Sequence, residues 1–105
     1  MNNMTGDVKF CAILTMRYMN KSLMQSCHDY IASHMPPPPK GLIAMRSFHI
    51  APDRGMSLCY FDTNEILNAA FPSMKEFQQR VAAKFEAKAD AQKAITSSQS
   101  DFGDC

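Results

Sequence analysis

Four consecutive prolines, Pro36 to Pro39, constrain the fold of this chain more than any other feature of its sequence. The chain has 105 residues, so a domain boundary at the prolines would leave a front piece too small to bury a core without disulfides or metal. The prolines therefore belong inside a single domain. We predict one domain over residues 1–105, with the folded protomer at 8–99, a flexible N-terminus at 1–7 and a flexible tail at 100–105.

The residues on either side of the prolines indicate what the run does. Ser22 can cap a helix that has to end by Met35, because a residue that precedes proline is driven out of the α region. A strand follows from Gly41. We interpret the prolines as a rigid, extended corner between helix and strand. Recognition of the run by a proline-binding partner is the alternative.

The segment from Val8 to Met19 alternates between apolar and mixed side chains, as a strand with one buried face does. The wholly apolar positions are Val8, Phe10, Ala12, Leu14, Met16 and Tyr18. The mixed positions are Lys9, Cys11, Ile13, Thr15, Arg17 and Met19. We expect the mixed positions to lie away from the helices.

A second strand, which ends at Ile50, and a third that reads MSLCYFD are predicted to form a hairpin around the turn APDRG. The loop would consist of Asp53, Arg54 and Gly55. The expected cross-strand pairs are then Ile50 with Leu58, His49 with Cys59, Phe48 with Tyr60, and Arg46 with Asp62. The last pair would form a salt bridge.

A second helix is predicted in two parts. Asp62 or Thr63 caps the first part, which Pro72 interrupts. Ser73 and Glu76 have the spacing of a capping box, which would restart the helix.

A last edge strand is expected near Ala94 to Ser98. The complete order is then strand, helix, strand, strand, helix, strand. This order predicts an α+β protein with the ferredoxin-like βαββαβ arrangement, in which helices cover one face of an antiparallel four-stranded sheet.

Charge and hydropathy exclude two classes of partner. The formal net charge is +1, with 11 Lys and Arg against 10 Asp and Glu, and no basic run is present. We therefore expect no nucleic-acid partner. Lys9, Thr15 and Arg17 break the first apolar run well short of a membrane span, so we expect no membrane partner and no signal peptide.

The cysteines indicate neither a metal site nor disulfides. The spacing of Cys11, Cys27, Cys59 and Cys105 matches no zinc motif. Without an export signal, we interpret all four as reduced thiols and place the protein in the cytoplasm. No metal or cofactor is predicted.

The strand FCAILTMRY, the hairpin, the passage SLCYFDTNEILNAAF and the late AITSS resemble the dimeric α+β barrel superfamily. That superfamily includes antibiotic-biosynthesis-type monooxygenases and stress-responsive barrel proteins. The resemblance covers residues 8–99 as a pattern of elements and implies a homodimer whose two sheets enclose a cavity. Apolar residues on both parities of the strand after Gly41 support a partner, since a sheet covered on one side leaves its other face to water.

The predicted pocket lies on the sheet face away from the helices. We expect it to bring together Cys11, Ile13, Thr15 and Arg17 from the first strand with Ile43, Met45, Ser47, His49, Cys59 and Phe61 from the hairpin. Such a pocket would be mostly apolar with a few polar groups, like most small-molecule sites. His49 could move protons as the catalytic base, and Arg17 could hold a carboxylate or an enolate oxygen. The alternative is that both side chains are structural or solvated.

Two functions follow as hypotheses. In the first, the barrel binds an apolar or aromatic small molecule without converting it, since no catalytic signature can be picked out of the sequence. In the second, the resemblance implies a cofactor-independent monooxygenase-like enzyme that acts on an aromatic or quinol-type substrate, with His49 as base. Haem oxygenation is disfavoured, because the haem-degrading branch uses a tryptophan and a histidine near the second helix. This chain has no Trp and no histidine after His49.

Overall fold

The computed structural model describes residues 9–97, which contain six elements. In chain order these are β1 (Phe10–Arg17), α1 (Lys21–His34), β2 (Leu42–Ile50), β3 (Arg54–Phe61), α2 (Asn64–Lys84) and β4 (Lys88–Ile95). This is the predicted order. The segments predicted to be flexible, 1–7 and 100–105, lie outside the described residues.

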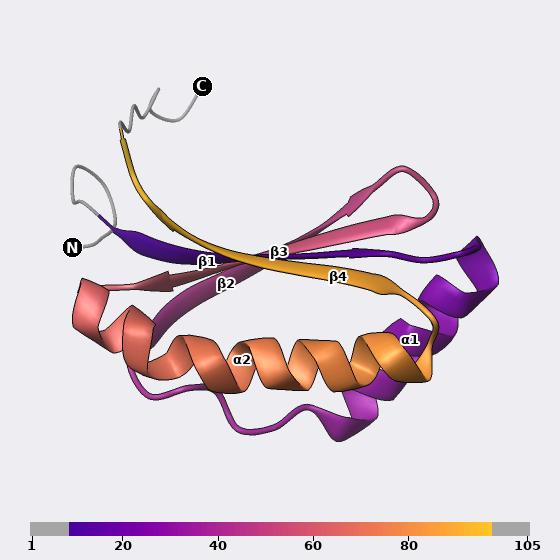
Figure 1. Cartoon of the computed structure of the whole chain (residues 1–105), viewed down its shortest axis with the longest axis horizontal. Helices are drawn as coiled ribbons and strands as arrows, with labels where there is room; N and C mark the ends of the chain where they lie inside the picture. The colour runs from indigo at the N-terminus through magenta and orange to yellow at the C-terminus, as the bar shows by residue number, and fades with distance from the viewer. Residues whose placement is uncertain (1–8, 98–105) are drawn as a thin grey trace, which may run out of the picture.

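The strands form one antiparallel sheet in the order β2-β3-β1-β4, so β1 and β3 are central while β2 and β4 are the edges. Both helices lie on the same side of this sheet, as Figure 1 shows. The long helix α2 packs on β1, β3 and β4. The ferredoxin-like α+β fold predicted from the sequence is confirmed, and no helix or strand of residues 9–97 covers the other face of the sheet. We call this the open face.

The N-cap of helix α1 lies two residues earlier than expected. Asn20, rather than Ser22, is the N-cap, and its Oδ1 accepts a hydrogen bond from the N–H of Leu23 at 2.8 Å. The helix ends at His34, and Met35 has extended backbone angles ahead of the prolines. The proline run therefore connects α1 to β2 as an extended corner, as predicted.

Helix α2 is capped at Thr63, whose Oγ1 accepts from the N–H of Ile66 at 3.1 Å. It continues without a break through Pro72, so the predicted interruption and restart at Ser73 were wrong. A proline inside a helix costs about 3 kcal/mol. Burial on both sides of Pro72 offsets this cost, as the buried residues Leu67, Ala70, Val81 and Ala82 show.

The hairpin between β2 and β3 turns earlier than predicted. Ile50 pairs with Arg54, which leaves Ala51, Pro52 and Asp53 as the loop. Ala51, the first residue of this loop, has a left-handed φ of 64°. The observed pairs are His49 with Gly55, Phe48 with Met56, Ser47 with Ser57, and Arg46 with Leu58.

Tertiary contacts explain this register. The N–H of Tyr18 donates to the carbonyl of Asp53 at 2.7 Å, which joins the loop to the end of β1. Asp62 forms no pair with Arg46. Instead, it accepts a hydrogen bond from Lys9 at 3.1 Å. Neither contact can be inferred from the residues of the hairpin alone.

A β-bulge between Leu42 and Ala44 reverses the parity of β2. Leu42 lies opposite Phe61 and packs with the core beneath α2. Beyond the bulge, Met45 lies opposite Cys59, so the odd-numbered residues of β2 face the helices. The sequence prediction assumed that side chains alternate between the two faces along the whole strand. The alternation holds only within each part of β2, before and after the bulge.

The last strand is present, but it begins six residues before its predicted position near Ala94 and runs from Lys88 to Ile95 along the edge beside β1. Helix α2 ends at a cap on Phe85, and Glu86 then takes a left-handed φ of 55°. The chain changes direction at Glu86, so β4 starts two residues later, at Lys88.

The core has two parts, and β1 contributes to both. The first consists of Met16, Tyr18, Met24, Cys27, Val81 and Ala82. The second consists of Ala12, Cys59, Phe61, Leu67 and Ala70. Each part joins the same face of the sheet to a helix, so the apolar parity of β1 faces the helices as expected.

Gly41 fixes the junction between the proline corner and β2. It has a φ of 85°, which L side chains rarely adopt, and a Cβ at this position would clash with the side chain of Ile66 on α2. We therefore expect Gly41→Ala to lower the free energy of unfolding by about 1–3 kcal/mol. Urea unfolding of the variant and the wild type measures this difference.

Gly55→Ala is the matched control. A Cβ on Gly55 would lie 3.9 Å from the carbonyl oxygen of Phe48 and 4.0 Å from Nε2 of His28, which are ordinary contact distances. Equal destabilisation by the two variants would contradict the role given to Gly41.

Candidate functional site

A cavity of about 650 Å³ lies between the helix-covered face of the sheet and the two helices. The sheet contributes Leu14, Met16, Ser47, His49, Ser57 and Cys59 to its lining, and the helices contribute His28, Ile31, Met74, Phe77, Gln78 and Val81. Pro36, Pro37 and Pro39 also line it, so the proline corner forms part of its wall. The volume is typical of a site for a small organic molecule.

Two histidines from different elements lie together in the lining of this cavity. The rings of His28, on α1, and His49, on β2, stack with their centroids 4.8 Å apart and their planes 19° apart. The Tyr18 ring lies edge-on to His28 at 6.1 Å. Burial, and to a lesser extent the nearby His49, lowers the pKa of His28, while Asp29 acts in the opposite direction. His28 is therefore neutral at neutral pH and can accept a proton.

Two serines lie beside this histidine pair on the same face of the sheet. Ser47 Oγ is 2.9 Å from Ser57 Oγ, and the two residues are direct cross-strand partners on β2 and β3. Ser47 is two residues from His49, so their Cα atoms lie about 6.5 Å apart along the strand. The histidines and serines thus form a polar strip on an otherwise largely apolar floor.

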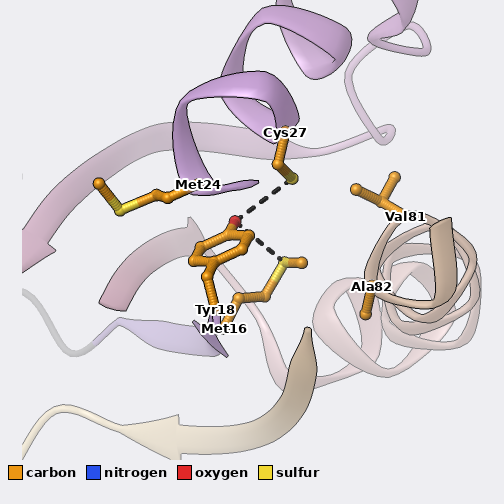
Figure 2. Close-up of a cluster of buried hydrophobic side chains, with 6 residues drawn as sticks. All are labelled: Met16, Tyr18, Met24, Cys27, Val81 and Ala82. Carbon is orange, nitrogen blue, oxygen red and sulfur yellow. Dashed lines mark hydrogen bonds between the residues drawn. The ribbon is translucent and has the colours of Figure 1, made fainter. Parts of the chain in front are cut away.

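Beside His28, the hydroxyl of Tyr18 contacts two sulfur atoms (Figure 2). The Tyr18 hydroxyl lies 3.3 Å from Cys27 Sγ and 3.7 Å from Met16 Sδ. Burial, together with the hydrogen bond to Cys27, raises the pKa of Tyr18 far above its usual value. Tyr18 therefore keeps its proton at neutral pH, and its ring packs edge-on against His28.

Gln78 fastens α2 to the sheet beside the cavity. Its Nε2 donates to the carbonyls of Thr15 and Asp90, at 3.0 and 3.1 Å, and these are paired residues of β1 and β4. Its Oε1 is buried and has no hydrogen-bond partner among the described residues. The two donated bonds fix the distance between α2 and the floor.

The residues predicted for one pocket face lie on opposite faces of the sheet. Ser47, His49 and Cys59 face the helices and line the cavity, and Phe61 is wholly buried on the same side. Cys11, Thr15 and Arg17 belong to the open face, since Cys11 pairs with Tyr60 while Cys59 pairs with Ala12. The predicted shared face was therefore wrong. The cause is the pairing of β3 with β1 and the bulge in β2, which together turn these hairpin side chains toward the helices.

Arg17 has a different setting from the one expected. It lies opposite Arg54 on β3 and opposite Lys88 on β4, so three cations form a row across one end of the open face. All three side chains are exposed, and none forms a salt bridge with another described residue. A binding role for Arg17, Thr15 or Cys11 stays a prediction.

Sequence reasoning missed His28. Met24, His28 and Ile31 have the spacing of one helical face, and Met24 is buried. That spacing was the available signal that His28 points toward the sheet.

Burial raises the pKa of each described thiol, so none is activated as a nucleophile through a lowered pKa. Cys11, Cys27 and Cys59 are buried and free, as expected, while Cys105 lies outside the described residues. Burial, and secondarily Cys11, raises the pKa of Cys59 to about 11, so its thiol is protonated at neutral pH. Within residues 9–97, no three His, Cys, Asp or Glu side chains come together as a metal site. No helix of the described chain is long and apolar enough to span a membrane.

No protein-family model and no curated protein matches this sequence. Solved structures do match the fold. A dimeric ferredoxin-like protein from an uncultured marine organism superposes with a TM-score of 0.69 at 14% identity, over 89% of this chain and 91% of that chain. A monooxygenase from the ActVA-Orf6 gene of Streptomyces coelicolor, in complex with nanaomycin D, gives a TM-score of 0.68 at 9% identity, over 88% and 90% of the two chains.

A third match is SnoaB, a cofactor-independent oxygenase from Streptomyces nogalater. It has a TM-score of 0.58 at 7% identity, over 94% of this chain and all of that one. The fold is that of these ferredoxin-like proteins. The ferredoxin-like fold that the resemblance implied is thus confirmed, and identities this low carry no statement about chemistry.

Acidification is expected to destabilise the protein through His28. Its pKa in the folded state lies below its ordinary value of 6.5, so between these two values the unfolded chain binds more protons than the folded one. The stability that neutral His28 contributes is complete above pH 6.5 and is lost as the pH falls through the lowered pKa. Urea unfolding from about pH 7.5 to about pH 5 should show a steeper fall for wild type than for His28→Gln.

His49→Gln provides a graded control. It removes the neighbouring charge that helps lower the pKa of His28, so its slope should lie between those of wild type and His28→Gln. A His28→Gln variant with the full wild-type slope would contradict the assignment to His28.

Proposed function

We propose that this protein binds an aromatic small molecule in the cavity between its sheet and its helices. The stacked pair His28 and His49 at the edge of an otherwise largely apolar cavity carries this proposal. Apolar walls such as Leu14 and Phe77 stabilise a buried ring by about 25 cal/mol per Å². The imidazoles fix its polar group.

The free thiols support a reducing compartment, in line with a cytoplasmic location.

The lowered pKa of His28 favours a second candidate function, that of a cofactor-independent monooxygenase-like enzyme. A neutral histidine can take a proton from an acidic group of the ligand, and the resulting electron-rich anion can react with O2 without help from a protein-bound cofactor. His49, the base expected from the sequence, stacks on His28 and so reaches the same ligand group. ActVA-Orf6 and SnoaB support this candidate, because oxygenase chemistry is described for both.

A hydroxylated planar compound is expected to raise the melting temperature. We choose 2-hydroxy-1,4-naphthoquinone as the probe, because it carries an acidic hydroxyl on a flat ring system. Binding to the folded state stabilises by about 2.7 kcal/mol at a hundredfold excess over Kd. His28→Gln and His49→Gln should lose most of the shift. Arg17→Gln, which alters the open face, should keep it.

A shift that needs Arg17 but not the histidines would place the site on the open face and contradict the proposal. Oxygen uptake then separates binding from catalysis. With anthrone, oxidation of the CH2 group to a carbonyl consumes O2, with one oxygen atom entering the product and the other leaving as water. Uptake above the uncatalysed rate that is lost in His28→Gln would support the enzyme, and stabilisation without uptake would support the binding protein.

We also propose that the open face is covered by the same face of a second copy. Phe48 and Ile50 are large apolar side chains on this face, with 46% and 37% of their surfaces exposed. A sheet with helices on one side needs a cover for its other apolar side. One structural match is described as dimeric. In this dimer, Cys11, Thr15 and Arg17 face the space between the two sheets.

Light scattering at micromolar concentration should return the mass of a dimer. Phe48→Glu places a charge in the middle of the proposed interface and should shift the equilibrium toward the monomer. Ala83→Glu, at an exposed position of α2 on the opposite side of the sheet, should leave the dimer intact. A monomeric wild type would overturn the dimer but not the cavity, which lies within one chain.

A further inference from the structure

The paired hydroxyls of Ser47 and Ser57 have hydrogen-bonding capacity that the protein does not use. Their oxygens lie 2.9 Å apart, so one hydroxyl donates to the other. Each serine hydroxyl has a single hydrogen. One hydrogen of the pair therefore has no partner among the described residues. Both side chains line the cavity, where a ligand can reach them.

The pair has polar neighbours on one side only. Along the helix-covered face, the row of His49 and Gly55 lies on one side of it, and the row of Met45 and Cys59 lies on the other. The Cys59 thiol is buried and protonated and is a weak hydrogen-bonding group. Among these three rows of the floor, strong hydrogen-bonding side chains thus lie only in the row of the serines and in the row of His49.

We propose that the Ser47–Ser57 pair donates a hydrogen bond to a second oxygen atom of the ligand, so that the site selects aromatic compounds that carry an accepting oxygen besides the group held by the histidines. The proposal rests on the function proposed above and deepens it. The separation of about 6.5 Å between neighbouring same-face positions of a strand is close to the span of one ring with an oxygen at each end.

The arrangement also suits a ligand that loses its proton to a histidine. Negative charge on a conjugated ring spreads to a carbonyl oxygen elsewhere on the ring. A fixed hydroxyl aimed at that oxygen stabilises the charge as it develops. The hydrogen bond between the two serines polarises the donating hydroxyl and strengthens this contact. Ser47 and Ser57 act here as specificity-determining residues, and the proton goes to the histidines.

Two probes that differ in the accepting oxygen test this inference. Both 2-hydroxy-1,4-naphthoquinone and 2-naphthol present a hydroxyl on a fused ring system, but only the quinone carries ring carbonyls. The variant to measure is Ser47→Ala with Ser57→Ala, because either serine alone keeps a hydroxyl that can donate. We expect its affinity for the quinone to fall about tenfold, while its affinity for 2-naphthol stays within about twofold of wild type.

Two further variants control for effects on the fold. Ser26→Ala removes an exposed hydroxyl on α1 and should change neither affinity. Ser47→Thr with Ser57→Ala restores one hydroxyl on a strand position that favours threonine, and should recover most of the preference for the quinone. Isothermal titration gives both affinities, and the visible absorption of the bound quinone anion reports whether its oxygen is still hydrogen-bonded.

Each outcome decides between the hypotheses. An equal loss for both probes would overturn the inference, because the serines would then act on the shape of the cavity. Unchanged affinity for both probes would also overturn it and leave the proposed function standing. A wild type that binds neither probe would contradict the proposed function and this inference together. A loss confined to the quinone, with recovery in the threonine variant, is the expected result.

Discussion

The burial of one face of β1 beneath both helices is the interaction on which the rest of the structure depends. Met16 of β1 and Tyr18, just past its end, pack in one cluster with residues of α1 and α2 such as Cys27 and Val81. Ala12 of β1 packs in a second cluster with Leu67 near the start of α2. A single strand thereby positions both helices. Because β1 is also central in the sheet and pairs with β3 and β4, the registers of those strands are set relative to the same buried side chains.

The cavity follows from how the helices share the sheet between them. Helix α2 packs on β1, β3 and β4, and β2 is the strand farthest from β4. The space over β2 is left to α1 and the proline corner, which reach it through His28 and through prolines such as Pro37. The site is therefore built where the layer of helices is thinnest, and its polar groups come from the two elements that meet there.

Local patterns were sufficient to predict the elements but not the faces of the hairpin. The alternation of β1 and the proline corner after Met35 depend on neighbouring residues, so the sequence alone predicts them. The face of His49 depends on the bulge beside Ala44 and on the hydrogen bond between Tyr18 and Asp53, which exist only once distant strands have met. The prediction placed His49 on the wrong side of the sheet, and its role in proton chemistry stays a prediction.

The same separation of local from distant effects applies to helix α2 and to His28. Pro72 is a strong local signal for a helix end, yet burial of Leu67 before it and Val81 after it keeps the helix whole. His28 carries no local signal beyond its spacing from Met24. His28 belongs to the candidate site because its ring stacks on that of His49 on β2, and this contact forms only in the folded chain.

The two edge strands limit how copies of this chain can associate. On β4, the exposed residues Lys88, Asp90 and Lys93 place charges along the edge, and on β2 the bulge near Ala44 interrupts the row of free backbone groups. Both features hinder the addition of another strand, which is the contact that lengthens a sheet without limit into fibres. Contact through the open face has no such extension, because one copy uses up the whole face of the other. In the dimer that we propose, self-association therefore ends at two copies, and the edges of the sheet disfavour any longer assembly.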